Sequence, residues 1–207
     1  MLLDHGSNPN SVSIPNSVST SSGENQEDDY RTPLQIAVQN QDIEMIRILF
    51  QYKADANGYF IDNGTNNDKY KKSHLPRTPL QEASLEGRRD IIESLLEHGA
   101  DVKSPPVTGD GATALQYAAI QGLVGIAHLL LEHDADVNAP PAKTDGRTAL
   151  EGAAEHGRID MVQLLLNAGA NVFGDGQVHY ENALRRASGN GHHAIRRMLE
   201  KWHSDRE

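Results

Sequence analysis

The sequence predicts an all-α solenoid of five stacked helix–turn–helix repeats, with half a repeat before them. Three observations lead to this prediction. One pattern of residues recurs along the 207-residue chain, and glycine stands at two fixed places within it. The apolar content of 37% suits thin cores between neighbouring repeats better than one large core.

The recurring pattern begins at a polar residue that is followed by Pro-Leu or Ala-Leu. Its five origins lie 46, 35, 35 and 34 residues apart, and they are Thr32, Thr78, Thr113, Thr148 and Asn182. Glycine stands nine residues after the origin in four of the five repeats, and a pair of large apolar residues stands 17 and 18 residues after it in the first four. Such self-similarity indicates one structural unit copied along the chain.

The first half of each repeat predicts a short helix. The origin side chain can accept a hydrogen bond from the free amides of a helix start, and proline is tolerated next, as in Thr78-Pro79. Leu80 and Ala83 then share one edge, where the small alanine allows a neighbouring helix to approach. Gly87 ends the helix, because glycine enters the left-handed conformation without penalty.

The second half of each repeat predicts another short helix. Ile91-Ile92 lie one turn before Leu95-Leu96, which gives this helix an apolar face, and Gly99 ends it. Two helices this short bury their apolar faces only by stacking on a copy of themselves. We therefore expect repeats at about 30–57, 76–103, 111–138, 146–172 and 180–207.

The first repeat departs from the pattern at both helix ends. Gln41 and Lys53 stand at positions where glycine is the usual residue. A non-glycine residue in the left-handed conformation costs on the order of 1 kcal/mol. We therefore expect this repeat to be the least stable part of the array.

The two ends of the sequence differ. Leu2-Leu3 in "LLDHGSNPN" match the leucine pairs that end second helices, so residues 1–10 predict half a repeat. Terminal repeats normally need a polar outer face, so we expect a piece cut from a longer protein; the alternative is a start assigned inside the array. In the fifth repeat, Arg196 and Glu200 replace apolar residues that would face a following copy, which indicates a capping repeat and a true end.

Two insertions lengthen the connections between repeats. Residues 11–29 are polar, serine-rich and acidic at their end, and we expect them to be disordered. Residues 58–75 predict a long finger loop, with a turn signal at Asn63-Gly64 and a lysine cluster at 69–72. The cluster fits a solvated loop better than a nuclear import signal or an anion-binding patch.

Several short stretches resemble the ankyrin repeat. "TPLQEA", "TALQYAA" and "LLEHGADV" match its T-P-L-H-x-A signature and the turn after its second helix, and the resemblance recurs five times over almost the whole chain. The signature histidine is replaced throughout, which resembles the glutamine-bearing arrays of large fungal proteins; the residues at that position are Gln35, Gln81, Gln116, Glu151 and Arg185. We expect glutamine to make some of the hydrogen bonds of that histidine.

Composition and motifs argue against several functions. A net charge of −10 disfavours a nucleic-acid partner, and no apolar run approaches the ~20 residues of a membrane span. The chain has no cysteine and no phosphate-loop, metalloprotease or serine-hydrolase motif. We expect no enzyme activity, no cofactor and no metal. We expect a cytoplasmic location, with the nucleus as the alternative.

Histidines recur beside the predicted helix stops, at His5, His98, His133 and His156. At the end of a helix, a histidine interacts favourably with the last carbonyl groups and with the helix dipole. We therefore interpret these histidines as helix-end residues rather than as metal ligands.

The resemblance implies that a partner is held by finger tips and by the exposed end of each first helix. On that basis the candidate partner-binding residues are Arg77, Leu85, Glu86, Ile120, Gln121, Arg147, Glu155 and His156. Leu85 and Ile120 share one offset in adjacent repeats, so we expect them side by side as an apolar pair with a polar rim. The alternative is that each packs against the helix of the neighbouring repeat.

Two functions remain open. The first is a monomeric scaffold or binding module that recognises another protein through its concave face and finger loops, without catalysis of its own. The second is the C-terminal sensor or regulatory region of a longer nucleotide-hydrolysing signalling protein, whose catalytic part precedes residue 1. Both hypotheses predict the same surface on this chain.

Overall fold

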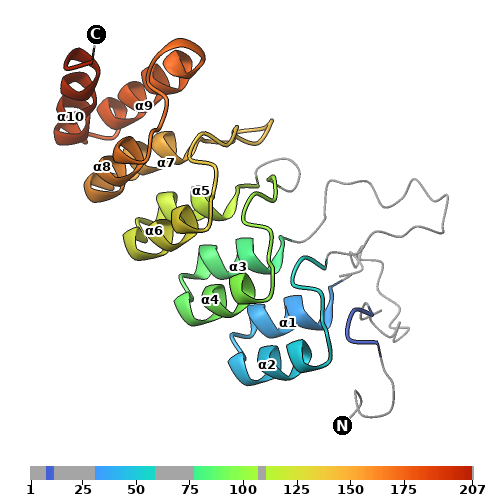
Figure 1. Cartoon of the computed structure of the whole chain (residues 1–207). Helices are drawn as coiled ribbons and strands as arrows, with labels where there is room; N and C mark the ends of the chain where they lie inside the picture. The colour runs from blue at the N-terminus through green and yellow to red at the C-terminus, as the bar shows by residue number, and fades with distance from the viewer. Residues whose placement is uncertain (1–7, 12–30, 59–76, 107–110, 207) are drawn as a thin grey trace, which may run out of the picture.

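The computed structural model describes residues 8–11, 31–58, 77–106 and 111–206, which form five helix pairs stacked in a row (Figure 1). The α-helices are α1 (Pro33–Gln39), α2 (Ile43–Gln51), α3 (Pro79–Glu86), α4 (Arg89–Glu97), α5 (Ala114–Gln121), α6 (Val124–Glu132), α7 (Ala149–Glu155), α8 (Ile159–Asn167), α9 (Gln177–Gly189) and α10 (His193–Ser204). A single-turn 3-10 helix, η3 (Gly174–Gly176), precedes α9. The predicted all-α stack is confirmed, and no strand forms within the described ranges.

Three of the expectations from sequence fall largely outside the described residues. They are the leucine pair at positions 2 and 3, the insertion at 11–29 beyond its first residue, and the finger insertion at 59–75.

The first helices of the repeats form an inner row, and the second helices form an outer row (Figure 1). Neighbouring first helices, such as α5 and α7, pack together more extensively than neighbouring second helices, such as α6 and α8. Small side chains allow this approach, since Ala83, Ala118 and Ala153 are at most 1% exposed. The inner row is therefore the tighter one, and the stack curves towards it.

Threonine caps begin four of the five first helices, as predicted. Each hydroxyl accepts a hydrogen bond from the backbone amide three residues later, and these residues are Thr32, Thr78, Thr113 and Thr148. The prediction is wrong for Asn182, which lies inside α9 because that helix begins at Gln177. In the fifth repeat η3 leads directly into α9, so residues that precede the origin are helical rather than extended.

Buried glutamines join each of the first three repeats to the loop that follows. Gln81 accepts a hydrogen bond from the amide of Thr78 at 3.0 Å, and its Nε2 donates to the carbonyl of Pro105 at 2.9 Å. Gln35 makes the same pair of bonds with Thr32 and the carbonyl of Arg77, and Gln116 makes them with Thr113 and the carbonyl of Ala139. Glutamine therefore makes hydrogen bonds at the position of the signature histidine, and these bonds join each helix start to the following loop.

Glu151 stands at the same position in the fourth repeat and bonds differently. A carboxylate has no N–H to donate, so it cannot bind the carbonyl groups of a following loop. Its Oε1 lies 2.7 Å from Nδ1 of His179, and its Oε2 lies 3.4 Å from Nε of Arg186. Both partners belong to α9, and the Glu151 side chain is only 3% exposed. The buried carboxylate thus ties the fifth repeat to the fourth.

Residues in the left-handed conformation end the first helices where the pattern places them. The glycines nine residues after the origin have φ between 72° and 78°; they are Gly87, Gly122, Gly157 and Gly191. In the first repeat Gln41 and Lys53 adopt φ of 57° and 63°, so the expected backbone strain is present.

The C-terminal pair, Arg196 and Glu200, form an exposed ion pair at 2.7 Å on α10.

Leu150→Ala is expected to lower the free energy of unfolding by about 2–5 kcal/mol, because truncation of a buried leucine leaves a cavity. Leu150 is 3% exposed, as predicted for a core residue of α7. Urea unfolding followed by circular dichroism measures the change. Val178→Ala is the matched control, since Val178 is 55% exposed. An effect of Leu150→Ala no larger than that of the control would show that the repeats are misaligned.

The first repeat is expected to exchange its amide hydrogens before the third and fourth. It carries two strained residues, and α1 packs on α3 less extensively than α3 packs on α5. Relief of about 2 kcal/mol of strain, about 1 kcal/mol at each residue, in the double variant Gln41→Gly, Lys53→Gly should slow exchange in α1 and α2 roughly thirtyfold. Hydrogen exchange with mass spectrometry compares residues 32–57 with 113–172. Equal protection of both segments in the unmodified chain would refute this expectation.

Glu151→Gln is expected to destabilise the array by about 1–3 kcal/mol, because Arg186 and His179 lose the carboxylate they share. The reciprocal variant Gln116→Glu should also destabilise, since its carboxylate would face the carbonyl oxygens of Ala139 and Pro140. Urea unfolding of both variants measures how much stability depends on matching each residue to its partners, which are α9 side chains for Glu151 and loop carbonyl groups for Gln116. Neutral behaviour of Glu151→Gln would show that these contacts contribute nothing to stability.

Candidate partner-binding surface

One edge of the inner row is built from two positions in each of the first four repeats. One precedes the origin threonine, and the other lies eight residues further on, near the end of the first helix. The pairs formed in this way are Arg31 with Gln39, Arg77 with Leu85, Ala112 with Ile120, and Arg147 with Glu155. The first and fourth of these pairs are hydrogen-bonded within their own repeat, whereas the second and third place apolar side chains at the edge. The edge is therefore polar at its two ends and carries apolar side chains in its middle.

Arg77 connects the second repeat to the third. Its Nε donates to the hydroxyl of Tyr117 at 2.8 Å, and its Nη1 lies 3.0 Å from the carboxylate of Glu82. Burial opposes the charge on Arg77, but the hydrogen bonds to Tyr117 and Glu82 outweigh it and raise the pKa of the guanidinium. The guanidinium also lies 5.3 Å from the centre of the Tyr117 ring. Arg77 is thus a fixed positive charge.

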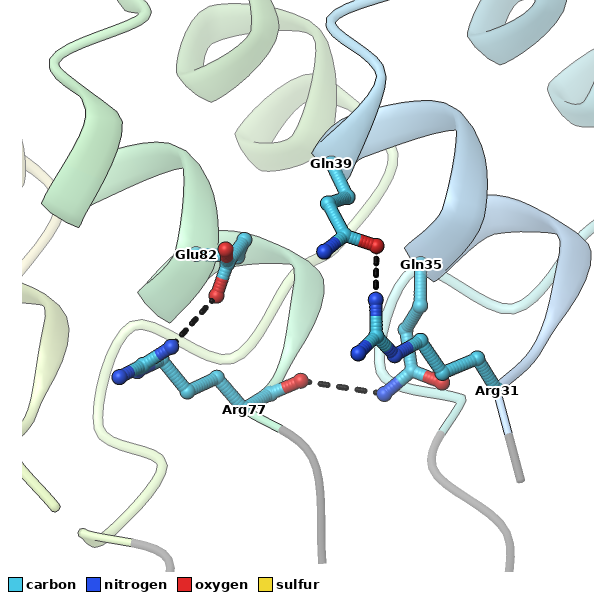
Figure 2. Close-up of a pocket in the computed structure, with 5 residues that line it drawn as sticks. All are labelled: Arg31, Gln35, Gln39, Arg77 and Glu82. Atoms are coloured by element: carbon cyan, nitrogen blue, oxygen red, sulfur yellow. Dashed lines mark hydrogen bonds and ion pairs between the residues drawn. The ribbon is translucent and has the colours of Figure 1, made fainter. Parts of the chain in front are cut away.

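A shallow pocket opens between α1 and α3, beside this arginine. Figure 2 shows the five side chains that line it, with dashed bonds from Arg31 to Gln39, from Gln35 to the backbone of Arg77, and from Arg77 to Glu82. Sequence reasoning did not select Arg31, Gln39 or Glu82. The signal was present for the first two, since they occupy the offsets of Arg147 and Glu155.

Arg147 and Glu155 form the centre of a charged cluster in the fourth repeat. Arg147 Nη2 donates to Glu155 Oε1 at 3.1 Å, and Nη1 of Arg186 donates to Glu155 Oε2 at 2.9 Å. The hydrogen bond from Arg147 lowers the pKa of Glu155, although burial alone would raise it, and the charge of Arg186 lowers it further. Glu155 thus stays ionised between two cations. Sequence reasoning missed Arg186, which lies 31 residues away in the chain.

Leu85 and Ile120 are half-buried on α3 and α5, two helices that pack against each other. Ile120 also contacts the fourth repeat: a Cβ atom built on Gly152 would lie 2.7 Å from its Cγ1. The side chain of Ile120 therefore occupies the space that Gly152 leaves open on α7. This contact supports the packing alternative for part of Ile120, while the rest of its surface stays accessible.

The remaining candidates directly follow Leu85, Ile120 and Glu155 in the chain. Glu86 and Gln121 are exposed at the ends of α3 and α5. His156 is exposed after α7, with Nδ1 at 3.0 Å from the carbonyl oxygen of Gly152, and His98 makes the same contact with Ser94 at 2.8 Å. Both histidines bind helix-end carbonyl groups, as predicted. Among the described residues, no group of three or more acidic, histidine or cysteine side chains is arranged to hold a metal ion.

In the described part of the chain, no helix has the length and apolar character needed to cross a membrane.

Comparison with known proteins identifies the repeats. No curated protein matches the chain. A family model of three ankyrin repeat copies matches residues 1–106 and again residues 103–175. Ankyrin repeats are generally protein–protein interaction modules. Since these matches cover most of the sequence and agree with the stacked helix pairs, the chain belongs to the ankyrin repeat family.

Proposed function

We propose that this chain is a scaffold that binds another protein along the exposed edge of its inner row, without catalysis of its own. Two observations support the proposal: Leu85 and Ile120 are half-buried at the same offset of the packed helices α3 and α5, and groups of fixed charges form in the second and fourth repeats. Arg77 is held by Tyr117 and Glu82, and Glu155 is held by Arg147 and Arg186.

Such an arrangement suits protein recognition. Binding energy at interfaces is concentrated in a few central residues that a polar rim shields from water. Here the apolar pair is the centre, and Glu86, Gln121 and His156 supply the rim. The arginines of the surface are already oriented by bonds within the array, so a partner would order few side chains on binding.

The location of the surface can be tested with a photo-cross-linking amino acid. Placed at Gln121, it should form covalent adducts with one partner in cells, because Gln121 is exposed beside the apolar pair. The control position is Ile159, which is 39% exposed on the outer-row helix α8. Equal yields of the same adduct from both positions would place the partner elsewhere.

Ile120→Arg and Leu85→Arg should each weaken binding of that partner at least tenfold, because an unpaired charge replaces an apolar contact at the centre. Leu85→Arg is the sharper variant, since Ile120 also contacts Gly152. Binding is measured by calorimetry, and folding by thermal unfolding of the same samples. Ile159→Arg makes the same chemical change on the outer row and should leave the affinity unchanged. Parallel loss of folding and binding in both edge variants would support packing as their only role.

A further inference from the structure

Two asparagines join the loop after a second helix to the backbone of the repeat that follows. Nδ2 of Asn57 donates to the carbonyl oxygen of Gly99 at 2.9 Å, and its Oδ1 accepts from the amide of Asp101 at 2.6 Å. Asn138 makes the same pair of bonds with the fourth repeat, at 3.1 and 2.8 Å. The join needs a side chain that both donates and accepts, which an amide does and a carboxylate does not.

The two asparagines differ in the residue that comes next. Asn57 is followed by Gly58, whereas Asn138 is followed by alanine. The backbone nitrogen of the next residue can attack the side-chain carbonyl carbon of an asparagine, and glycine hinders this attack least because it has no Cβ. Asn190 also precedes a glycine, but its Nδ2 binds a carbonyl oxygen of its own helix at 3.1 Å. Among the described residues, Asn57 alone combines the reactive sequence with a join between repeats.

The folded loop opposes this reaction. The amide of Gly58 donates to the carbonyl oxygen of Asp55 at 3.0 Å, and both bonds to the second repeat hold the side chain of Asn57. The attack therefore requires the loop to open. The first repeat contains the strained Gln41 and Lys53 and has the least extensive inner-row packing, so it should open more often than the others.

We propose that Asn57 is a deamidation site that reacts when the first repeat opens, and that its conversion releases this repeat from the second. In the opened loop, the nitrogen of Gly58 loses its proton to the solvent and bonds to Cγ of Asn57. The bond from Cγ to Nδ2 breaks, and the nitrogen leaves as ammonia. Water then opens the succinimide ring. Cleavage at Cγ gives aspartate, and cleavage at the main-chain carbonyl carbon gives isoaspartate.

Either product weakens the join. Aspartate has no N–H to donate, so a carboxylate oxygen would face the carbonyl oxygen of Gly99. Isoaspartate also lengthens the main chain by a further carbon atom, which displaces the acceptor from the amide of Asp101. No step of the reaction restores the amide, so the change acts in one direction.

Peptide mapping by mass spectrometry tests the reaction in the full chain, aged at neutral pH in water labelled with heavy oxygen. Asn57 should convert about tenfold faster than Asn138, or more, because Asn138 makes the same bonds without a following glycine. Gly58→Ala should remove this difference; its Cβ would meet no heavy atom closer than 3.1 Å, so the loop can keep its fold. The double variant Gln41→Gly, Lys53→Gly should also slow conversion, because it stabilises the first repeat. Equal rates at Asn57 and Asn138, or an unchanged rate in the double variant, would overturn the proposal.

Asn57→Asp reproduces one product and tests its consequence separately. This variant should raise the hydrogen-exchange rate in α1 and α2 about tenfold, because the join loses a bond and brings two acceptors together. Asn190→Asp makes the same chemical change within one repeat and should leave exchange in α1 and α2 as it was. Unchanged exchange in Asn57→Asp would reject the release of the first repeat.

Discussion

A helix pair in this chain is stable only where a neighbouring pair covers its apolar face. The helices of the first four repeats are seven to nine residues long, too short to hold together by local hydrogen bonds alone. Burial between repeats supplies the missing free energy, so each repeat depends on the quality of its two interfaces. These interfaces are unequal. The inner-row contact is most extensive between α7 and α9 and least extensive between α1 and α3, so stability should decline towards the first repeat.

The residue three positions after the origin determines how each repeat joins the next element. A glutamine both accepts from the cap and donates to carbonyl groups, so it needs an extended loop beside it, as Gln81 and Gln116 have. A carboxylate only accepts, so Glu151 needs donors, and α9 provides His179 and Arg186. Replacement of one amide by a carboxylate therefore accompanies a change from an extended loop to a helix that begins early.

The sequence predicted those features that depend on neighbours along the chain. Caps such as Thr78, helix ends such as Gly87, and the strained Gln41 follow from local conformational preference, and all were confirmed. The early start of α9 and the bonds of Arg77 to Tyr117 and of Arg186 to Glu155 were not predicted. These depend on how closely successive repeats approach, which the spacing of the pattern does not specify. One signal was available: glycine inside a helix lowers stability, so Gly152 already indicated a close neighbour.

Paired charges shape what the candidate surface can recognise. Every arginine of the Arg77 and Arg147 groups is bonded to a carboxylate within the array, so each group presents an oriented dipole rather than a free charge. The field of such a dipole falls off faster with distance than that of a charge, and salt screens what remains beyond about 10 Å. Long-range attraction therefore contributes little here, although the whole chain carries a net charge of −10. Selection among partners must depend on contact: the shape of the apolar pair, and donors and acceptors that meet groups already fixed in place.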